Sequence, residues 1–121
     1  MYQFAYHRPA SLAEAEKLFS AAEDPKFLGG GQTLIPTLKQ RLASPSDLID
    51  LSGLKDLAGI SVSGGVVTIG AATRHADVAA SAEVRKAIPA LADLAGWIGD
   101  PAVRHRGTIG GSIANADPSA D

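Results

Sequence analysis

Apolar side chains recur at helical spacing in two long stretches of the chain. The first stretch opens with Ser11-Leu12-Ala13-Glu14, a capping box in which Ser and Glu can satisfy free N–H groups at a helix start. The second runs over residues 84–98, and Pro89 is expected to divide it into two helices. We expect Trp97 to pack in the core beside this second stripe.

Shorter apolar runs predict strands between the helices. Residues 2–6, 26–28 and 48–51 fit strands, the first of them at a sheet edge, and apolar positions alternate on both sides of Gly64-Gly65, which predicts a hairpin. A helix is expected after Thr33, with Pro36 tolerated in its first turn, and a helical turn over 77–80. The last twenty residues show no long periodicity. The class is therefore α+β or α/β, with a seam near residues 52–56.

Composition narrows the classes of function. Leu, Ile, Val and Phe supply 29 of the 121 residues, above the roughly 20% below which disorder is the default. The net charge of −2 argues against nucleic acid as a partner. No stretch approaches the length of a membrane span, and no signal-peptide pattern opens the chain, so we expect a cytoplasmic location. With no Cys, the chain offers no thiolate nucleophile and no ligands for an iron–sulfur cluster.

Candidate chemistry begins at Leu28-Gly29-Gly30-Gly31-Gln32-Thr33, a glycine loop between a predicted strand and a predicted helix. Glycines let the backbone approach a ligand closely, and free N–H groups at a helix start favour phosphate. A tight turn whose glycines serve only the backbone is the alternative.

A second glycine loop follows near the end of the chain. Arg104-His105-Arg106-Gly107-Thr108-Ile109-Gly110-Gly111-Ser112 sets small residues and hydroxyls beside two positive charges, a combination that suits a diphosphate. A solvated basic turn is the alternative. Two such loops in one short chain favour a single shared ligand.

Familiar catalytic and nucleotide motifs are missing. Gly29 and Gly31 give G-x-G, but Leu34 stands where the dinucleotide fingerprint needs Gly, and no Walker sequence occurs. No G-x-S-x-G elbow is present. His7, His75 and His105 lack metal-ligand spacing, and we expect each to be a surface or capping residue. We therefore expect no catalytic acid, base or nucleophile and no metal ligand.

The two loops together resemble a known family. Residues 29–36, residues 104–112 and Asn115-Ala116-Asp117-Pro118-Ser119-Ala120-Asp121 look like the flavin loops of the FAD-binding medium subunit of molybdenum hydroxylases, the carbon monoxide dehydrogenase and xanthine dehydrogenase group. Leu48-Ile49-Asp50-Leu51 and Gly70-Ala71-Ala72-Thr73 match in the expected order. The resemblance covers essentially the whole chain.

The resemblance implies a fold and a cofactor site. The fold is α+β, of the FAD-binding type with two α/β subdomains (molybdopterin dehydrogenase FAD-binding, vanillyl-alcohol-oxidase-like) and the flavin between them. Residues 1–53 would form the first subdomain and residues 54–121 the start of a truncated second one. Both loops would hold the FAD pyrophosphate through backbone amides, and Asp121 would lie near the ribityl and ring end. The implied cofactor-binding residues are Gly29, Gly30, Gly31, Gln32, Thr33, Thr108, Ile109, Gly110, Gly111, Ser112 and Asp121.

The resemblance also implies a function and partners. Such a subunit passes electrons from [2Fe-2S] clusters through FAD to an external acceptor, as part of an oxidoreductase whose molybdenum cofactor is on a large subunit and whose clusters are on a small one. A chain without Cys agrees with clusters placed elsewhere. Two alternatives stay open: an interaction or folding fragment that no longer binds FAD, and an FAD-dependent oxidase or reductase outside the molybdenum group.

Length sets a further expectation. Subunits of this family run more than twice as long, so by itself this chain is expected to hold FAD weakly and to be inactive. Apolar residues in its second half, Ile109, Ile113 and the 114–116 stretch, would then be open to solvent. We expect the chain to cover them by forming a homodimer or a larger assembly.

Overall fold

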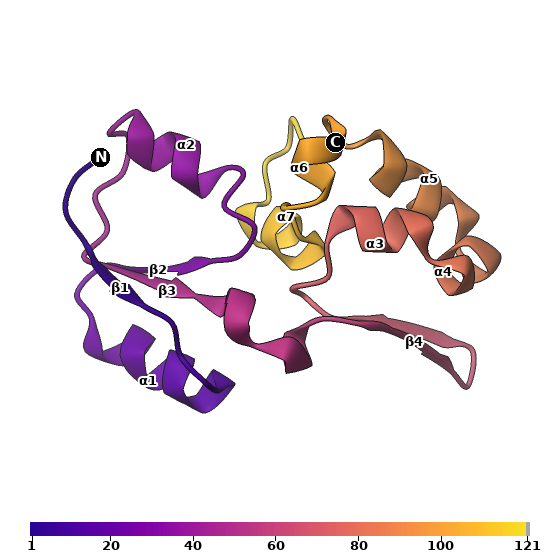
Figure 1. The fold of residues 1–121 in the computed structure, drawn as a ribbon, viewed down its shortest axis with the longest axis horizontal. Coiled ribbons are helices and arrows are strands. Elements are labelled where there is room, and N and C mark those ends of the chain that lie inside the picture. The colour runs from indigo at the N-terminus through magenta and orange to yellow at the C-terminus, as the bar shows by residue number, and fades with distance from the viewer. Residues whose placement is uncertain (121) are drawn as a thin grey trace. The chain divides into compact units, whose positions relative to one another are not determined.

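The chain forms two compact units, Met1–Lys55 and the residues from Asp56 onward. A computed structural model describes residues 1–120. Figure 1 shows the order of the elements along the chain. Within the described residues no helix is both long and apolar enough to cross a lipid bilayer.

The first unit is a three-stranded parallel sheet with two helices. Its elements are β1 (Ala5–His7), α1 (Leu12–Ala21), β2 (Pro25–Leu28), α2 (Leu34–Lys39) and β3 (Asp47–Asp50), followed by the 3-10 turn η1 (Leu51–Gly53). The strand order is β1-β3-β2, and both pairings are parallel. Figure 1 shows α1 and α2 on opposite sides of this sheet.

The central strand carries most of the core of the first unit. Leu48 and Ile49 of β3 are fully buried, and the helices add Ala15 and Leu38. The capping box predicted for α1 is confirmed in outline, because Ser11 accepts from Glu14 N–H at 3.2 Å and Glu14 accepts from Ala10 N–H at 2.8 Å. The predicted edge position of the first strand is also confirmed, although β1 is only three residues long.

Two acidic side chains fasten β1 to β3. The Tyr6 hydroxyl donates to Asp50, and His7 Nε2 lies 2.6 Å from an Asp47 carboxylate oxygen. Hydrogen bonds from Ser46 and His7 lower the pKa of Asp47. Burial by itself would raise the pKa of Asp50, but hydrogen bonds from Tyr6 and Ser52 outweigh it and hold that pKa below its usual value. Both carboxylates are therefore stabilised in the charged form.

The second unit combines a hairpin with short helices. The 3-10 turn η2 (Lys55–Leu57) leads into β4 (Ile60–Ser63) and β5 (Val66–Ile69), which pair antiparallel. Gly64 and Gly65 have φ of +57° and +77°, the backbone that a two-residue hairpin turn demands, so the predicted hairpin is confirmed. The helices are α3 (His75–Ala80), α4 (Ala82–Ala87), α5 (Pro89–Trp97), α6 (Pro101–Arg104) and α7 (Ile109–Asn115).

A small aliphatic core holds the second unit together. Val78, Val84, Ala92 and Ala95, from α3, α4 and α5, are buried against the inner side chains of the hairpin. The predicted break at Pro89 is confirmed: Ile88 has φ −139° and ψ 72°, and Pro89 begins α5. Because the break at Pro89 changes the direction in which successive side chains point, the apolar positions of 84–98 do not line one continuous helix face. Ile88 and Leu94 are exposed.

The sequence expectation for Trp97 is wrong. Trp97 is 81% exposed instead of packing in the core, because the buried face of α5 is formed by Ala92 and Ala95 and the indole lies off that face. The stretch without periodicity contains α6 and α7. Helix α6 spans four residues, too few to show a periodic pattern, and α7 carries two glycines in seven residues, which oppose helix formation.

Candidate functional site

The first glycine loop connects β2 to α2 in the first unit. Gly31 has φ +74°, and a Cβ there would lie 2.9 Å from Ile35 Cγ1, so this position requires glycine. Its carbonyl accepts from Ile35 N–H at 3.0 Å, which joins the loop to the helix. The Gln32 side chain folds back and donates to the Gly30 carbonyl at 3.3 Å. Gly31 therefore has the backbone role that the tight-turn alternative expects, whereas no positive φ explains Gly30.

The N–H groups of this loop are available to a ligand. Among residues 1–120, no backbone or side-chain acceptor bonds the N–H groups of Gly30, Gly31, Gln32 or Thr33. Thr33 precedes α2 but makes no side-chain cap hydrogen bond, whereas Ser11 closes the start of α1. Unpaired backbone donors on a partly exposed loop are suited to the oxygens of a phosphate.

The second glycine loop connects α6 to α7 in the second unit and lies against residues 71–75. His75 N–H donates to the Gly107 carbonyl at 3.0 Å, Ile109 N–H to the Thr73 carbonyl at 3.0 Å, and Gly110 N–H to the Ala71 carbonyl at 2.9 Å. A Cβ at Gly110 would lie 2.6 Å from Ala71 Cβ, so only glycine permits this approach. We call residues 71–75 the template segment of this loop.

Most N–H groups of the second loop are already used. Besides the two bonds to the template segment, Gly111 N–H donates to Thr108 Oγ1 at 3.1 Å and Ser112 N–H to the Thr108 carbonyl at 3.1 Å. Within the described residues, the Thr108 N–H is the member of 108–112 without an acceptor. The Ser112 hydroxyl is on an exposed residue and adds a second polar group. The loop thus offers fewer backbone donors than the sequence suggested.

The positive charges near the second loop have mixed roles. Arg104 Nη1 donates to the carbonyls of Ile98 and Gly99 at 3.3 and 3.1 Å, so its guanidinium holds the turn after α5 instead of standing free for a diphosphate. His105 Nδ1 lies 2.6 Å from the Pro101 carbonyl, a capping role that agrees with the sequence expectation. Arg106 is exposed.

His75 departs from the sequence expectation. It was expected to be a surface or capping residue, yet it is 5% exposed and begins α3. Its Nε2 lies 3.1 Å from Ser112 Oγ, and burial lowers the pKa of its imidazole, so the ring is neutral at pH 7. No local sequence signal marks this contact, because the two residues are 37 positions apart.

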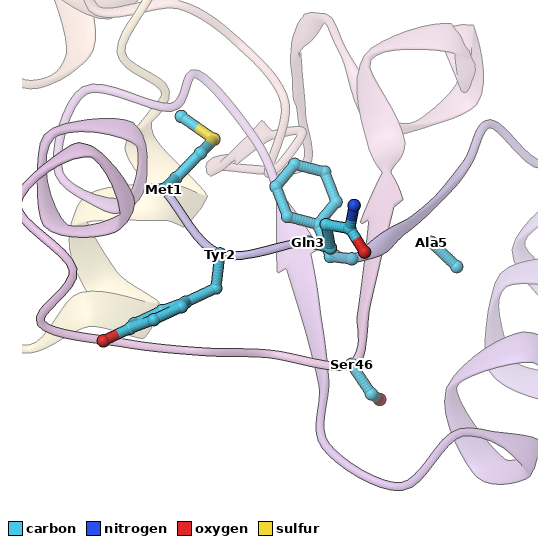
Figure 2. Close-up of a pocket in the computed structure, with 6 residues that line it drawn as sticks. Met1, Tyr2, Gln3, Ala5 and Ser46 are labelled. Carbon is cyan, nitrogen blue, oxygen red and sulfur yellow. The ribbon is translucent and has the colours of Figure 1, made fainter.

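Two hollows in the described surface differ in their relation to the glycine loops. One is open and lined by residues 1–5 and Ser46; Figure 2 shows the Met1 and Tyr2 side chains pointing away from each other, with no polar groups converging. The other, about 210 Å³, is lined mainly by aliphatic side chains of α5 and α7 and also by His75 and Ser112. Two of its lining residues, Ile109 and Ser112, belong to the second glycine loop. This hollow is smaller than the roughly 300 Å³ at which ligand pockets begin. No cluster of three metal-ligating side chains occurs in residues 1–120.

The residues present fit FAD at the first loop most clearly. Free N–H groups at 30–33 suit a pyrophosphate, and the second loop adds the Thr108 N–H and the Ser112 hydroxyl. The two loops belong to different units. Asp121, expected near the ribityl and ring end, lies outside the described residues.

Comparison with known proteins gives a match over almost the whole chain. The model of one family, the FAD binding domain in molybdopterin dehydrogenase, matches residues 2–121. The carbon monoxide dehydrogenase medium chain of Hydrogenophaga pseudoflava is 44% identical over 120 residues, which are 98% of this chain and 42% of that protein. The glyceraldehyde dehydrogenase medium chain of Sulfolobus acidocaldarius is 41% identical over 119 residues, 98% of this chain and 42% of that one.

A solved structure agrees with these relatives. The carbon monoxide dehydrogenase from Hydrogenophaga pseudoflava that lacks the Mo-pyranopterin moiety of the molybdenum cofactor matches with a TM-score of 0.95 at 45% identity. The match covers 98% of this chain and 42% of that one. The chain therefore spans about two fifths of the length of the curated relatives described above.

Proposed function

The chain belongs to the family of FAD-binding domains in molybdopterin dehydrogenases, and from that premise we propose that it is the FAD-binding part of an electron-transfer subunit of a molybdenum hydroxylase. The observation that carries the proposal is the row of free N–H groups at Gly30–Thr33, in a loop that the family match includes. Bound FAD would supply the redox chemistry that lets electrons from iron–sulfur clusters reach an external acceptor.

The protein's own part is to bind and orient. N–H groups of the Gly29–Thr33 loop would donate to phosphate oxygens, and the absence of a side chain at Gly29 and Gly30 lets the backbone come close. From the second loop, the Thr108 N–H and the Ser112 hydroxyl would add donors. The absence of side chains at Gly110 and Gly111 avoids overlap with Ala71 and with Thr108 Oγ1 at the start of α7. Ile109 fixes the loop through its bond to Thr73, and Asp121 completes the proposed set.

The proposal includes partners. Because the relatives above are named medium chains, we assign to this protein a large molybdenum-binding subunit and a small iron–sulfur subunit, in the cytoplasm. The absence of Cys supports clusters on another polypeptide. Affinity purification of the protein from its own cells should bring down a cysteine-rich partner with an iron–sulfur absorption spectrum. Recovery without such a partner would contradict this assignment.

The cofactor assignment is tested by titrating the ¹⁵N-labelled chain with FAD and following its amide resonances. We expect shifts at residues 30–33, and a dissociation constant that such spectra measure even in the millimolar range. Gly30→Val should abolish the shifts because a side chain there blocks the approach of the phosphate. Gly96→Ala is the control, since its methyl group would meet only Ala79 Cβ at 3.9 Å. Riboflavin, which lacks phosphate, should leave residues 30–33 unshifted.

Two results would count against the assignment. If FAD shifts no amide resonance of the wild-type chain, the chain does not bind FAD, and that result favours the alternative of an interaction or folding fragment. If Gly30→Val keeps wild-type affinity, the first loop is structural and the pyrophosphate is held elsewhere.

A further inference from the structure

His75 lies against both ends of the second glycine loop. Its backbone N–H holds the Gly107 carbonyl, and its ring packs on Gly107, where a Cβ would lie 3.0 Å from imidazole Cδ2. At the other end, Nε2 is 3.1 Å from Ser112 Oγ. One buried imidazole therefore contacts Gly107, the residue before Thr108, and Ser112, the last residue of the second glycine loop.

The position of one proton decides what Ser112 can do. A Ser hydroxyl has one hydrogen to donate and two lone pairs, and a neutral imidazole carries a proton on one nitrogen only. If Nε2 is bare, the Ser112 hydroxyl donates to it, and its hydrogen is lost to a ligand. If Nε2 carries the proton, Ser112 Oγ accepts from it, and the hydroxyl hydrogen is free to donate outward.

The other contacts of His75 do not fix which ring nitrogen carries the proton. Burial keeps the imidazole neutral, because it lowers the pKa of His75. Within residues 1–120 no hydrogen-bond partner fixes Nδ1. The ring is therefore free to take either neutral form, and whatever Ser112 bonds to on its exposed side will select between them.

We propose that His75 is a positioning residue for FAD: its Nε2–H donates to Ser112 Oγ, so that the Ser112 hydroxyl donates to a phosphate oxygen of the cofactor. The inference rests on the proposed FAD site. It assigns a role to a residue that touches the ligand only through Ser112. The template segment 71–75 then supports the second loop in two ways, through backbone bonds at Ala71 and Thr73 and through this side chain.

The tautomer of His75 gives a direct spectroscopic test. Long-range ¹H–¹⁵N spectra of the labelled chain distinguish a protonated from a bare Nε2 at neutral pH. We expect saturating FAD to leave His75 in the Nε2–H form. A His75 ring that carries its proton on Nδ1 with FAD bound would overturn the inference.

Matched substitutions separate hydrogen bonding from packing. Gln places its Nε2 donor the same number of bonds from the backbone as His Nε2, whereas Asn reaches only the position of Nδ1. We expect His75→Asn to weaken FAD binding about tenfold, the scale for losing one hydrogen bond to a charged group. His75→Gln should recover most of that affinity, and in the Ser112→Ala background neither change should weaken binding further.

The outcomes keep the two proposals apart. If His75→Asn and His75→Gln bind FAD as the wild type does, the positioning role is wrong and the FAD site stands. If the two variants lose affinity equally, His75 acts by packing alone, and the inference is also wrong. Wild-type protein that binds no FAD would overturn the proposed function itself. If both His75 variants unfold, the His75 tautomer measured in the wild-type chain with FAD bound decides the inference. A proton on Nε2 then supports it and a proton on Nδ1 overturns it.

Discussion

Glycines in the two glycine loops are there for different reasons. Gly31 needs its left-handed backbone at φ +74°, and Gly110 needs a missing side chain so that α7 can approach Ala71. Gly30 is not among the glycines with positive φ, and its N–H group stays free. Sequence alone cannot separate these roles, because all three residues look identical in a glycine-rich motif. The structure thus distinguishes Gly31 and Gly110, which the fold requires, from Gly30, whose N–H group has no acceptor within the described residues.

The Tyr6–Asp50 contact gives a prediction at the same scale. Asp50→Asn should lower the free energy of unfolding at pH 7 by about 1–3 kcal/mol, because a charged acceptor for the Tyr6 hydroxyl and the Ser52 N–H is lost. Chemical denaturation followed by circular dichroism would measure it. Tyr6→Phe is the matched variant, since it removes one donor and keeps the Ser52 bond.

The pH dependence of that contact has a definite sign. The pKa of Asp50 is lowered in the folded protein, so its stabilisation is present above the unfolded value of about 3.9 and is lost as pH falls through the folded value. The difference in unfolding free energy between wild type and Asp50→Asn should therefore shrink between pH 5 and strongly acid solution. A difference that stays constant over this range would contradict the role given to the carboxylate.

Among the elements, the template segment organises much of the second unit. Thr73 Oγ1 accepts from Gly59 N–H at 2.9 Å, Ala72 N–H donates to Leu57 O at 2.7 Å, and the backbone of 71–75 then binds the second glycine loop. Helix α7 forms on this support despite its glycines. Tertiary hydrogen bonds and the local Thr108 side-chain cap, and not intrinsic helix propensity, allow a helix to begin at Ile109.

Paired glycine substitutions test the template segment. Gly110→Ala should lower the melting temperature, at a cost of about 1–3 kcal/mol, because the new methyl group overlaps Ala71. Gly96→Ala should instead stabilise the protein by up to about 1 kcal/mol, since Ala favours a helix and its Cβ meets only an ordinary contact. Equal effects of the two substitutions in thermal denaturation would mean that the close approach of α7 to Ala71 is unimportant.

Elements with local causes were predictable from the sequence. The capping box placed α1, the Gly64-Gly65 pair placed the hairpin, and Pro89 placed the start of α5. Long-range contacts were not predictable. The burial of His75 depends on Ser112 and Gly107, far along the chain, and the exposure of Trp97 depends on which face of α5 meets α3 and α4. The free N–H groups of the first loop were predictable from its glycine pattern. The sequence could not show that N–H groups of the second loop are already bonded, because their acceptors lie in the distant template segment.

On the scale of the whole molecule, an apolar surface of the second unit remains uncovered. Trp97 is 81% exposed and Ile113 72%, and Leu94 adds to the exposed apolar area. The sequence led us to expect a homodimer through this half of the chain, and exposed apolar side chains of this size favour such an association.

The single Trp reports on that expectation. In dilute solution, acrylamide should quench Trp97 fluorescence almost as well as it quenches free tryptophan. As protein concentration rises, we expect quenching to fall while the sedimentation coefficient increases. Trp97→Ser should shift the association to higher concentration. A sedimentation coefficient that stays constant at all concentrations, with unchanged quenching, would show that the chain does not pair through this surface.

The strand order β1-β3-β2 also sets the route by which the first unit folds. The central strand comes last in the chain, and Tyr6 and Asp50 meet across 44 positions. Until residues 47–50 arrive, β1 and β2 have no partner and no sheet exists to stabilise either helix. Parallel pairing over such sequence separations requires long loops to close before the strands can form hydrogen bonds. The entropy lost in closing these loops slows folding. A growing chain on the ribosome therefore gains this unit in one late step, and a nascent chain that lacks β3 exposes two unpaired strands to aggregation.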